Sequence, residues 1–165
     1  MREAMSRKVA AIDTAAPVSE AAERLAEEDV GLLAICRSGN RLRGVITDRD
    51  IVVRVIGQGL DPDALSVGEC GSGEPATVSP QESLDQAARR MEEEQVRRLP
   101  VTEEGRVIGI LSHSDLAAHG ADRRAGRLLE LLARCGGDRR SARWLLGHPY
   151  REERRIAGAV PRLYG

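Results

Sequence analysis

The residues best placed to do chemistry are two pairs, each a hydroxyl side chain followed three positions later by an aspartate. Thr47 and Asp50 stand in "GVITDRD", and Ser112 and Asp115 stand in "GILSHSD". One interpretation is a helix cap, in which the hydroxyl accepts a backbone N–H and the acid favours the helix dipole. The other is a nucleotide site, because free N–H groups at a helix start bind phosphate oxygens and a carboxylate accepts ribose hydroxyls.

The two pairs occupy equivalent places in an internal duplication. The segment "AAERLAEEDVGLLAI" (21–35) aligns with "AARRMEEEQVRRLPV" (87–101), and after a hairpin loop Gly44 aligns with Gly109, one residue having been lost between them. Self-similarity of this kind indicates one structural unit per copy. We therefore predict a first repeat over residues 1–60, a second over 61–120, and an extension over 121–165.

Each repeat is predicted to have the order β-α-β-β-α. A short strand (9–12 or 76–78) precedes a helix with apolar residues at helical spacing; two short strands around a glycine-bearing turn and a second helix follow. A three-stranded sheet with helices on one side leaves its other face bare. The predicted fold is therefore α/β (α+β), with the two repeats packed sheet to sheet as a pseudo-two-fold pair.

The composition excludes several classes of protein. Aromatic residues make up 2% of the chain, so the core must be aliphatic, and Cys36, Cys70 and Cys135 are spaced for neither a disulfide framework nor a zinc site. No apolar run is long enough for a membrane span and no signal peptide is visible, so we expect a cytoplasmic protein.

Catalysis is not expected. No nucleophile is paired with a base, no glycine-rich phosphate loop is present, and His113, His119 and His148 are too scattered to hold a metal. Asp50 and Asp115 belong to different clefts by the alignment, so they do not form an acid–base couple. We predict no enzyme activity, no catalytic residue and no metal.

The extension differs in charge from the rest of the chain. Residues 121–165 carry eleven arginines against five acidic residues, whereas the first 120 residues are acidic overall. One interpretation is a partly helical or disordered tail that caps the fold or extends a dimer contact. The other is a basic element that docks on nucleic acid or on an acidic protein partner, although no DNA-binding motif supports it and we consider nucleic acid the weaker partner.

The repeats resemble a known family. "GVITDRD", "GILSHSD" and the strand "VRRLPV" are similar to the motifs of tandem CBS domains, a pair also called a Bateman module. The whole chain resembles the small stand-alone actinobacterial CBS proteins of the hypoxic-response type. This resemblance implies a non-catalytic regulatory sensor that holds an adenine nucleotide (AMP, ADP or ATP) as a ligand in the clefts between the repeats. The alternative is an interaction or scaffold protein whose clefts stay empty.

The resemblance also assigns residues to the two clefts. Asp50 would hold the ribose, Thr47 the ribose or phosphate, and the basic pair before the proline of the other repeat the phosphates. The residues implied for the first cleft are Val45, Ile46, Thr47, Asp50, Thr77, Val78, Arg97 and Arg98. Those implied for a weaker second cleft are Ala10, Ala11, Ser112 and Asp115.

The second cleft is expected to bind less well. Gly31 and Leu32 stand where the first cleft has two arginines, and Ala34 replaces the family's proline. His113 is either a partial substitute for the arginines or a polar surface residue. We therefore expect one dominant site, which Asp50→Ala should abolish while leaving the fold intact.

The second helix of each repeat is apolar around much of its circumference. One sheet face cannot cover all of these side chains, so a monomer would leave an apolar patch in water. We expect a homodimer through these helices. The residues concerned are Ile51, Val52, Val53, Val55 and Ile56 in the first repeat and Leu116, Ala117 and Ala118 in the second.

Overall fold

The structure is a computed structural model, which describes residues 1–119. The extension predicted over 121–165 lies outside the described residues. The first repeat contains β1 (Ala11–Asp13), α1 (Val18–Glu27), β2 (Leu33–Arg37), β3 (Arg41–Ile46), α2 (Asp48–Asp50), the π-helical turn η1 (Ile51–Val55) and the 3-10 turn η2 (Ile56–Gln58). The second contains α3 (Val67–Cys70), β4 (Ser72–Gly73), α4 (Leu84–Glu94), β5 (Arg98–Glu103), β6 (Arg106–Ser112) and α5 (His113–Ala118).

The predicted α/β fold of two repeats is confirmed, but residues 76–78 do not form the predicted strand. These residues form a single parallel bridge, Val78 to Val101, in place of a strand. Val78 N donates to the carbonyl of Pro100 (3.0 Å), and Thr102 N donates to the carbonyl of Val78 (2.9 Å). Pro80 follows closely and has no N–H to donate, which is consistent with a ladder that stops after one residue.

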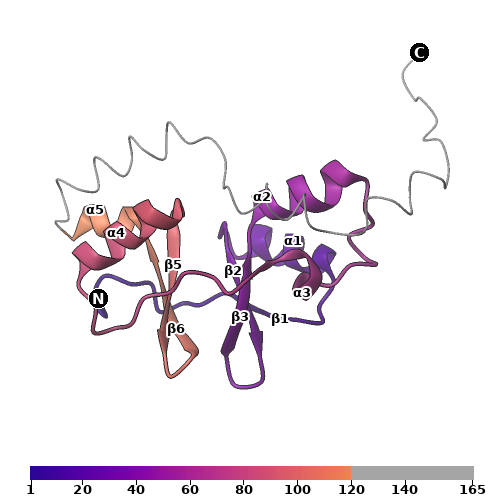
Figure 1. The fold of residues 1–165 in the computed structure, drawn as a ribbon. Helices are drawn as coiled ribbons and strands as arrows, with labels where there is room; N and C mark the ends of the chain where they lie inside the picture. Colours follow the sequence, from indigo (N-terminus) through magenta and orange to yellow (C-terminus); the bar gives the residue numbers. More distant parts are fainter. Residues whose placement is uncertain (120–165) are drawn as a thin grey trace, which may run out of the picture.

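The hairpin loops account for the residue lost between the copies. The β2–β3 loop has three residues between Arg37 and Arg41, whereas the β5–β6 loop has two between Glu103 and Arg106. In the shorter loop Glu104 and Gly105 both have positive φ, 51° and 75°, as a type I′ turn requires. Both loops point the same way, toward the bottom of Figure 1.

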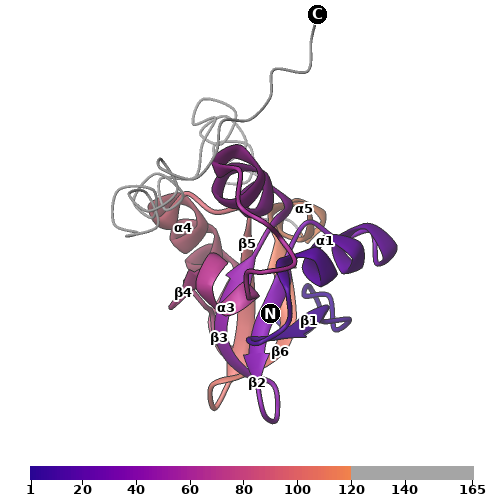
Figure 2. The ribbon, with the colours of Figure 1, turned by 90° about the vertical axis from the view of Figure 1, so that its right-hand side faces the viewer.

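The two halves of the sheet meet face to face as well as edge to edge. The strand order is β1-β2-β3-β6-β5, and β3 pairs with β6 at Arg41 and Arg106. Between the halves a small apolar cluster is formed by Ala34, Cys36 and Val107, with Ala11 and Ile110 packed against it. Helices lie on the two outer flanks (Figures 1 and 2). The predicted contact between the bare sheet faces is therefore present.

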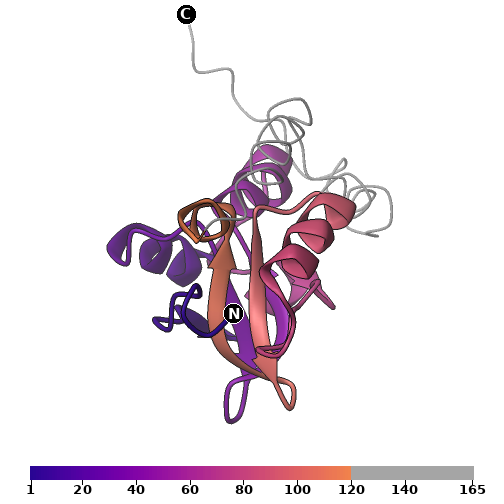
Figure 3. The ribbon, with the colours of Figure 1, turned by 90° about the vertical axis from the view of Figure 1, so that its left-hand side faces the viewer.

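Each repeat is completed by the segment that leads into the other repeat. Ala4 and Met5 pack in the core of the second repeat, although they stand at the start of the first repeat in sequence. Ser6 exchanges two backbone hydrogen bonds, both 2.9 Å, with Ile110 of β6, and Figure 3 shows the N-terminal segment beside β6.

The equivalent segment at the start of the second repeat does the same in the opposite direction. Val67 and Cys70 pack in the core of the first repeat, and Ser72 of β4 pairs with Val45 of β3. Gly44 is needed for this contact, because a Cβ there would lie 2.6 Å from the Ser72 carbonyl oxygen. The boundary between residues 60 and 61 therefore divides the sequence but does not divide the packing.

Candidate functional site

Both hydroxyl–aspartate pairs form reciprocal helix caps. Asp50 N donates to Thr47 Oγ1 (3.2 Å), while Asp50 Oδ2 accepts from Thr47 N (3.0 Å) and Thr47 Oγ1 (2.6 Å). In the second repeat Asp115 N donates to Ser112 Oγ (3.2 Å), and Asp115 Oδ2 accepts from Ser112 N (2.7 Å) and Oγ (2.6 Å). The cap interpretation is confirmed at both positions. Whether either carboxylate can also bind a ligand depends on its other oxygen, Oδ1.

The two aspartates differ in what surrounds that oxygen. Asp50 is 2% exposed, and its Oδ1 lies 3.2 Å from Nη2 of Arg54, which is 1% exposed. His119 occupies the position equivalent to Arg54 in the second repeat; it is exposed, and its Nδ1 lies 2.9 Å from the backbone oxygen of Asp115. Asp115 is half-buried and makes no ion pair within residues 1–119. The first cleft therefore contains a buried ion pair that the second lacks.

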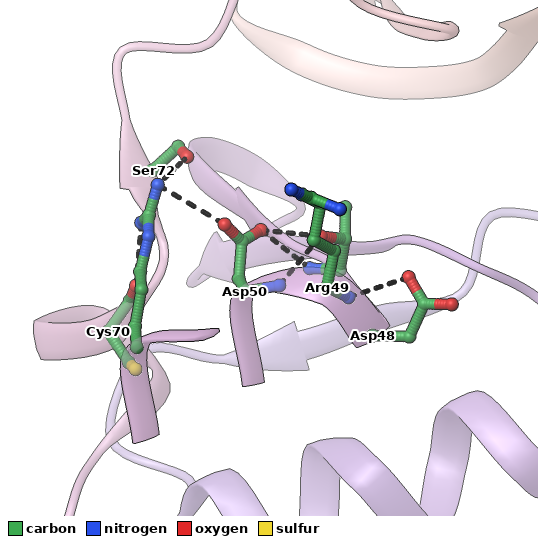
Figure 4. A network of polar contacts seen from close by, with 7 residues as sticks. Asp48, Arg49, Asp50, Cys70 and Ser72 are labelled. Carbon is green, nitrogen blue, oxygen red and sulfur yellow. Dashed lines mark hydrogen bonds and ion pairs between the residues drawn. The ribbon is translucent and has the colours of Figure 1, made fainter. Parts of the chain in front are cut away.

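Arg54 also reaches the segment at the start of the second repeat. We call residues 70–73, which run from the end of α3 through β4, the connector. Nη1 of Arg54 donates to the carbonyl of Cys70 (2.9 Å), and Nη2 lies 3.4 Å from Oγ of Ser72. Figure 4 shows Asp50 close to Cys70 and Ser72. A buried guanidinium is tolerated only with such partners.

Arg54 lies in the π-helical turn η1, whereas α5, the equivalent helix of the second repeat, is α-helical. Single π turns inside helices are rare and occur often at functional sites. Burial raises the pKa of the neighbouring Cys70 thiol to about 11, and the positive charge of Arg54 only partly opposes this. The first cleft therefore differs from the second in its backbone as well as in its charges.

The other residues implied for the first cleft are divided between a hollow and the cores. Val45 is half-buried and pairs with the connector. Thr77 lines a hollow of about 440 Å³, which is within the range of small-molecule pockets. The side chains of Ile46 and Val78 are buried in the two cores and position their neighbours. The remaining lining residues of the hollow are Leu42, Arg43, Gly73, Glu74, Pro75, Thr102 and Gly105.

The structure places the two arginines beside the second cleft, near Ser112, His113 and Gly31. Both are exposed; the Arg97 carbonyl accepts from His113 N (3.1 Å), and Arg98 pairs across strands with Ser112. A Cβ on Gly31 would lie 3.1 Å from Nη1 of Arg98. The sequence-based inference that the second cleft has no arginine is therefore corrected, because the guanidinium of Arg98 covers Gly31 at its wall.

The remaining residues of the second cleft are mostly structural. Ala10 is buried, and its carbonyl accepts from Ala34 N (2.9 Å). Ala11 packs between the two halves of the sheet. His113 is half-buried, and its Nδ1 has no hydrogen-bond partner within the described part of the chain.

Sequence reasoning missed Arg54 and Ser72. The only sequence signal for Arg54 is its spacing of four residues from Asp50, which places the two side chains on the same face of a helix. Ser72 carries no such signal, because its partner lies in another element.

The two repeats match a known protein family. The CBS domain family matches this chain twice, over residues 1–57 and 67–122. The chain belongs to the CBS domain family. "Hypoxic response protein 1" of Mycobacterium tuberculosis is 37% identical over 118 residues, which cover 72% of this chain and 82% of that protein.

Solved structures of CBS proteins agree. A crystal structure of Hypoxic Response Protein I with two coordinated zinc ions has a TM-score of 0.67 and 37% identity, covering 72% of this chain and 96% of that one. PAE2072 of Pyrobaculum aerophilum, complexed with AMP, has a TM-score of 0.65 and 28% identity (80% and 96% covered). CBSX2 in complex with AMP has a TM-score of 0.63 and 27% identity (72% and 93% covered).

Two further observations concern metals and membranes. Among residues 1–119, no three His, Cys, Asp or Glu side chains lie close enough together to hold a metal ion. The zinc ions belong to the relative's structure. No helix in the described part of this CBS pair is long and apolar enough to cross a membrane.

Proposed function

We propose that this CBS pair is a non-catalytic regulatory module that binds an adenine nucleotide, chiefly in its first cleft. The observation that carries the proposal is the helix start at Thr47 and Asp50, directly after β3, whose other end borders the hollow containing Thr77. Two similar CBS proteins have solved structures in complex with AMP. In this proposal Asp50 takes the ribose, Thr77 borders the base, and Arg97 and Arg98 take the phosphates.

The first cleft is proposed as the stronger site because the resemblance to nucleotide-binding CBS domains assigns Arg97 and Arg98, both exposed, to its phosphate end. The second cleft, around Ser112 and Asp115, has Gly31 and Leu32 at the equivalent positions, although Arg98 lies beside Gly31. Charge-assisted contacts to phosphate contribute about 1.5–3 kcal/mol each. Losing both arginines should therefore weaken binding at least tenfold.

A panel of purine nucleotides tests this proposal. AMP, ADP or ATP should raise the melting temperature of the full chain, because a ligand that binds only the folded state stabilises it by mass action. Calorimetry should find one dominant site per chain, at least tenfold weaker in Arg97→Ala/Arg98→Ala. Both arginines are exposed, so this variant should remain folded.

The matched control is Arg37→Ala/Arg89→Ala, which removes two exposed arginines outside the cleft and should bind as the wild type does. If no purine nucleotide shifts the melting temperature at millimolar concentration, the clefts are empty and the chain acts as an interaction scaffold. Two sites of equal affinity would contradict the order of the clefts.

We also propose that the module is a homodimer through its second helices. Val52 and Ile56 on the first of these helical segments are 59% and 57% exposed, unusually open for large apolar side chains. A two-fold contact would cover each patch with its counterpart. Light scattering should give the mass of a dimer, and Val52→Asp/Ile56→Asp should give a monomer. A wild-type monomer at tens of micromolar would contradict the proposal.

A further inference from the structure

Asp50 cannot accept a ribose in the arrangement described above. Its Oδ2 already accepts two hydrogen bonds from Thr47, its Oδ1 faces the Arg54 guanidinium, and the residue is 2% exposed. A ribose needs carboxylate lone pairs on an open side. Because the carboxylate is buried, one of the side chains that cover it must move before a ligand can use this aspartate.

Arg54 is the donor that can leave without opening the helix. The Thr47 contacts form the helix cap, and their loss would release the backbone at the start of α2. Arg54, by contrast, reaches Asp50 with a long side chain that has several rotatable bonds, so a rotamer change alone can break the contact. A nucleotide also brings phosphate oxygens, which are good alternative partners for a guanidinium.

Moving Arg54 would release the connector at the point where it touches the cleft. The same guanidinium holds the Cys70 carbonyl and Ser72 Oγ. The connector is tightly packed there, because a Cβ on Gly71 would lie 2.1 Å from Ile35 Cδ1 and 2.9 Å from the Val45 carbonyl oxygen. Because Arg54 contacts Asp50 as well as Cys70 and Ser72, it links the proposed ribose site to the connector.

We propose that the Arg54 guanidinium and the ribose of a bound nucleotide compete for the carboxylate of Asp50, so that occupation of the first cleft loosens residues 70–73. This inference rests on the proposed nucleotide-binding function of that cleft. The connector leads from the core of the first repeat into the second, so its release transmits occupation of the cleft from one repeat to the other. The second cleft has no such coupling, because exposed His119 stands at the position of Arg54.

Labelling of cysteine thiols during AMP binding tests the competition. Cys70 is 1% exposed and burial raises its thiol pKa to about 11, so in the folded protein it reacts only through local opening. Cys36, buried between the sheet halves, is the internal control. AMP should slow the labelling of Cys36 by stabilising the fold and should accelerate that of Cys70 several-fold, with each peptide followed by mass spectrometry.

Two variants at equivalent positions make the test specific. Arg54→Lys keeps a positive charge near Asp50 but has one ammonium group in place of the forked guanidinium. It should label fast at Cys70 without AMP, show no further acceleration with AMP, and bind AMP more tightly, because the competitor is weaker. His119→Lys places the same side chain in the second repeat and should respond as the wild type does. If Arg54→Lys does not fold, Ser72→Ala should show faster basal labelling of Cys70 and a smaller AMP effect.

The outcomes separate the two proposals. AMP binding with slower labelling at both cysteines would overturn the competition and leave the nucleotide site standing. Failure of AMP and the other adenine nucleotides to bind would overturn both. Opposite responses of the two cysteines, lost in Arg54→Lys, would support both.

Discussion

Arg54→Met should lower the free energy of unfolding by about 3–5 kcal/mol, because it leaves the Asp50 carboxylate buried without its cation. The two side chains are 1% and 2% exposed, and methionine fills similar space without charge. Urea unfolding followed by circular dichroism measures the loss.

His119→Met is the matched control, since it makes the same replacement at the exposed, equivalent position and should change stability by less than about 0.5 kcal/mol. Arg54→Met/Asp50→Asn should recover part of the loss, because no unpaired charge then remains. A loss below about 1 kcal/mol in Arg54→Met would show that the ion pair does not stabilise the fold.

The same ion pair revises the sequence-based expectation that Asp50→Ala leaves the fold intact. That change would leave the buried guanidinium of Arg54 without its carboxylate partner.

Neither repeat should fold when the chain is divided at the sequence boundary. A fragment of residues 1–60 lacks Val67 and Cys70 from its core, and a fragment of residues 61–119 lacks Ala4 and Met5. Each fragment also exposes the sheet face that Ala34, Cys36 and Val107 cover in the intact chain. Small domains have little stability to spare for such losses.

An equimolar mixture of the two fragments should regain the native circular dichroism and a cooperative thermal transition. A control fragment of residues 7–60, mixed with residues 61–119, should complement poorly because it lacks the N-terminal segment. A cooperative transition in either fragment alone would contradict this expectation.

The sequence predicted those parts of the fold that depend on local patterns. The caps at Thr47 and Ser112 and the turn at Glu104 and Gly105 follow from residue types at fixed spacing, and the structure has all three. Because the chain is duplicated, the local patterns of a cap and a glycine-bearing turn occur in both repeats. The order of elements in both repeats was predictable for the same reason.

The parts that the sequence did not predict depend on packing between distant residues. An acidic and a basic residue four positions apart look the same on a solvated helix as in a core, so the burial of Asp50 and Arg54 was not visible. The contact of Arg98 with Gly31 joins segments far apart in sequence. Likewise, nothing in the sequence around Met5 indicates that this residue completes the core of the other repeat.

The reciprocal exchange of leading segments has an evolutionary consequence. The first residues of each repeat (Ala4 and Met5, and Val67 and Cys70) pack in the core of the other repeat. A gene that encoded a single repeat would therefore form this core through two chains that exchange their first residues. Gene duplication and fusion would then have turned an obligate dimer into one chain, with the connector as the join. Fusion also freed the two halves to mutate separately. Arginine at position 54 and histidine at position 119 now differ, as expected if two once identical halves mutate separately.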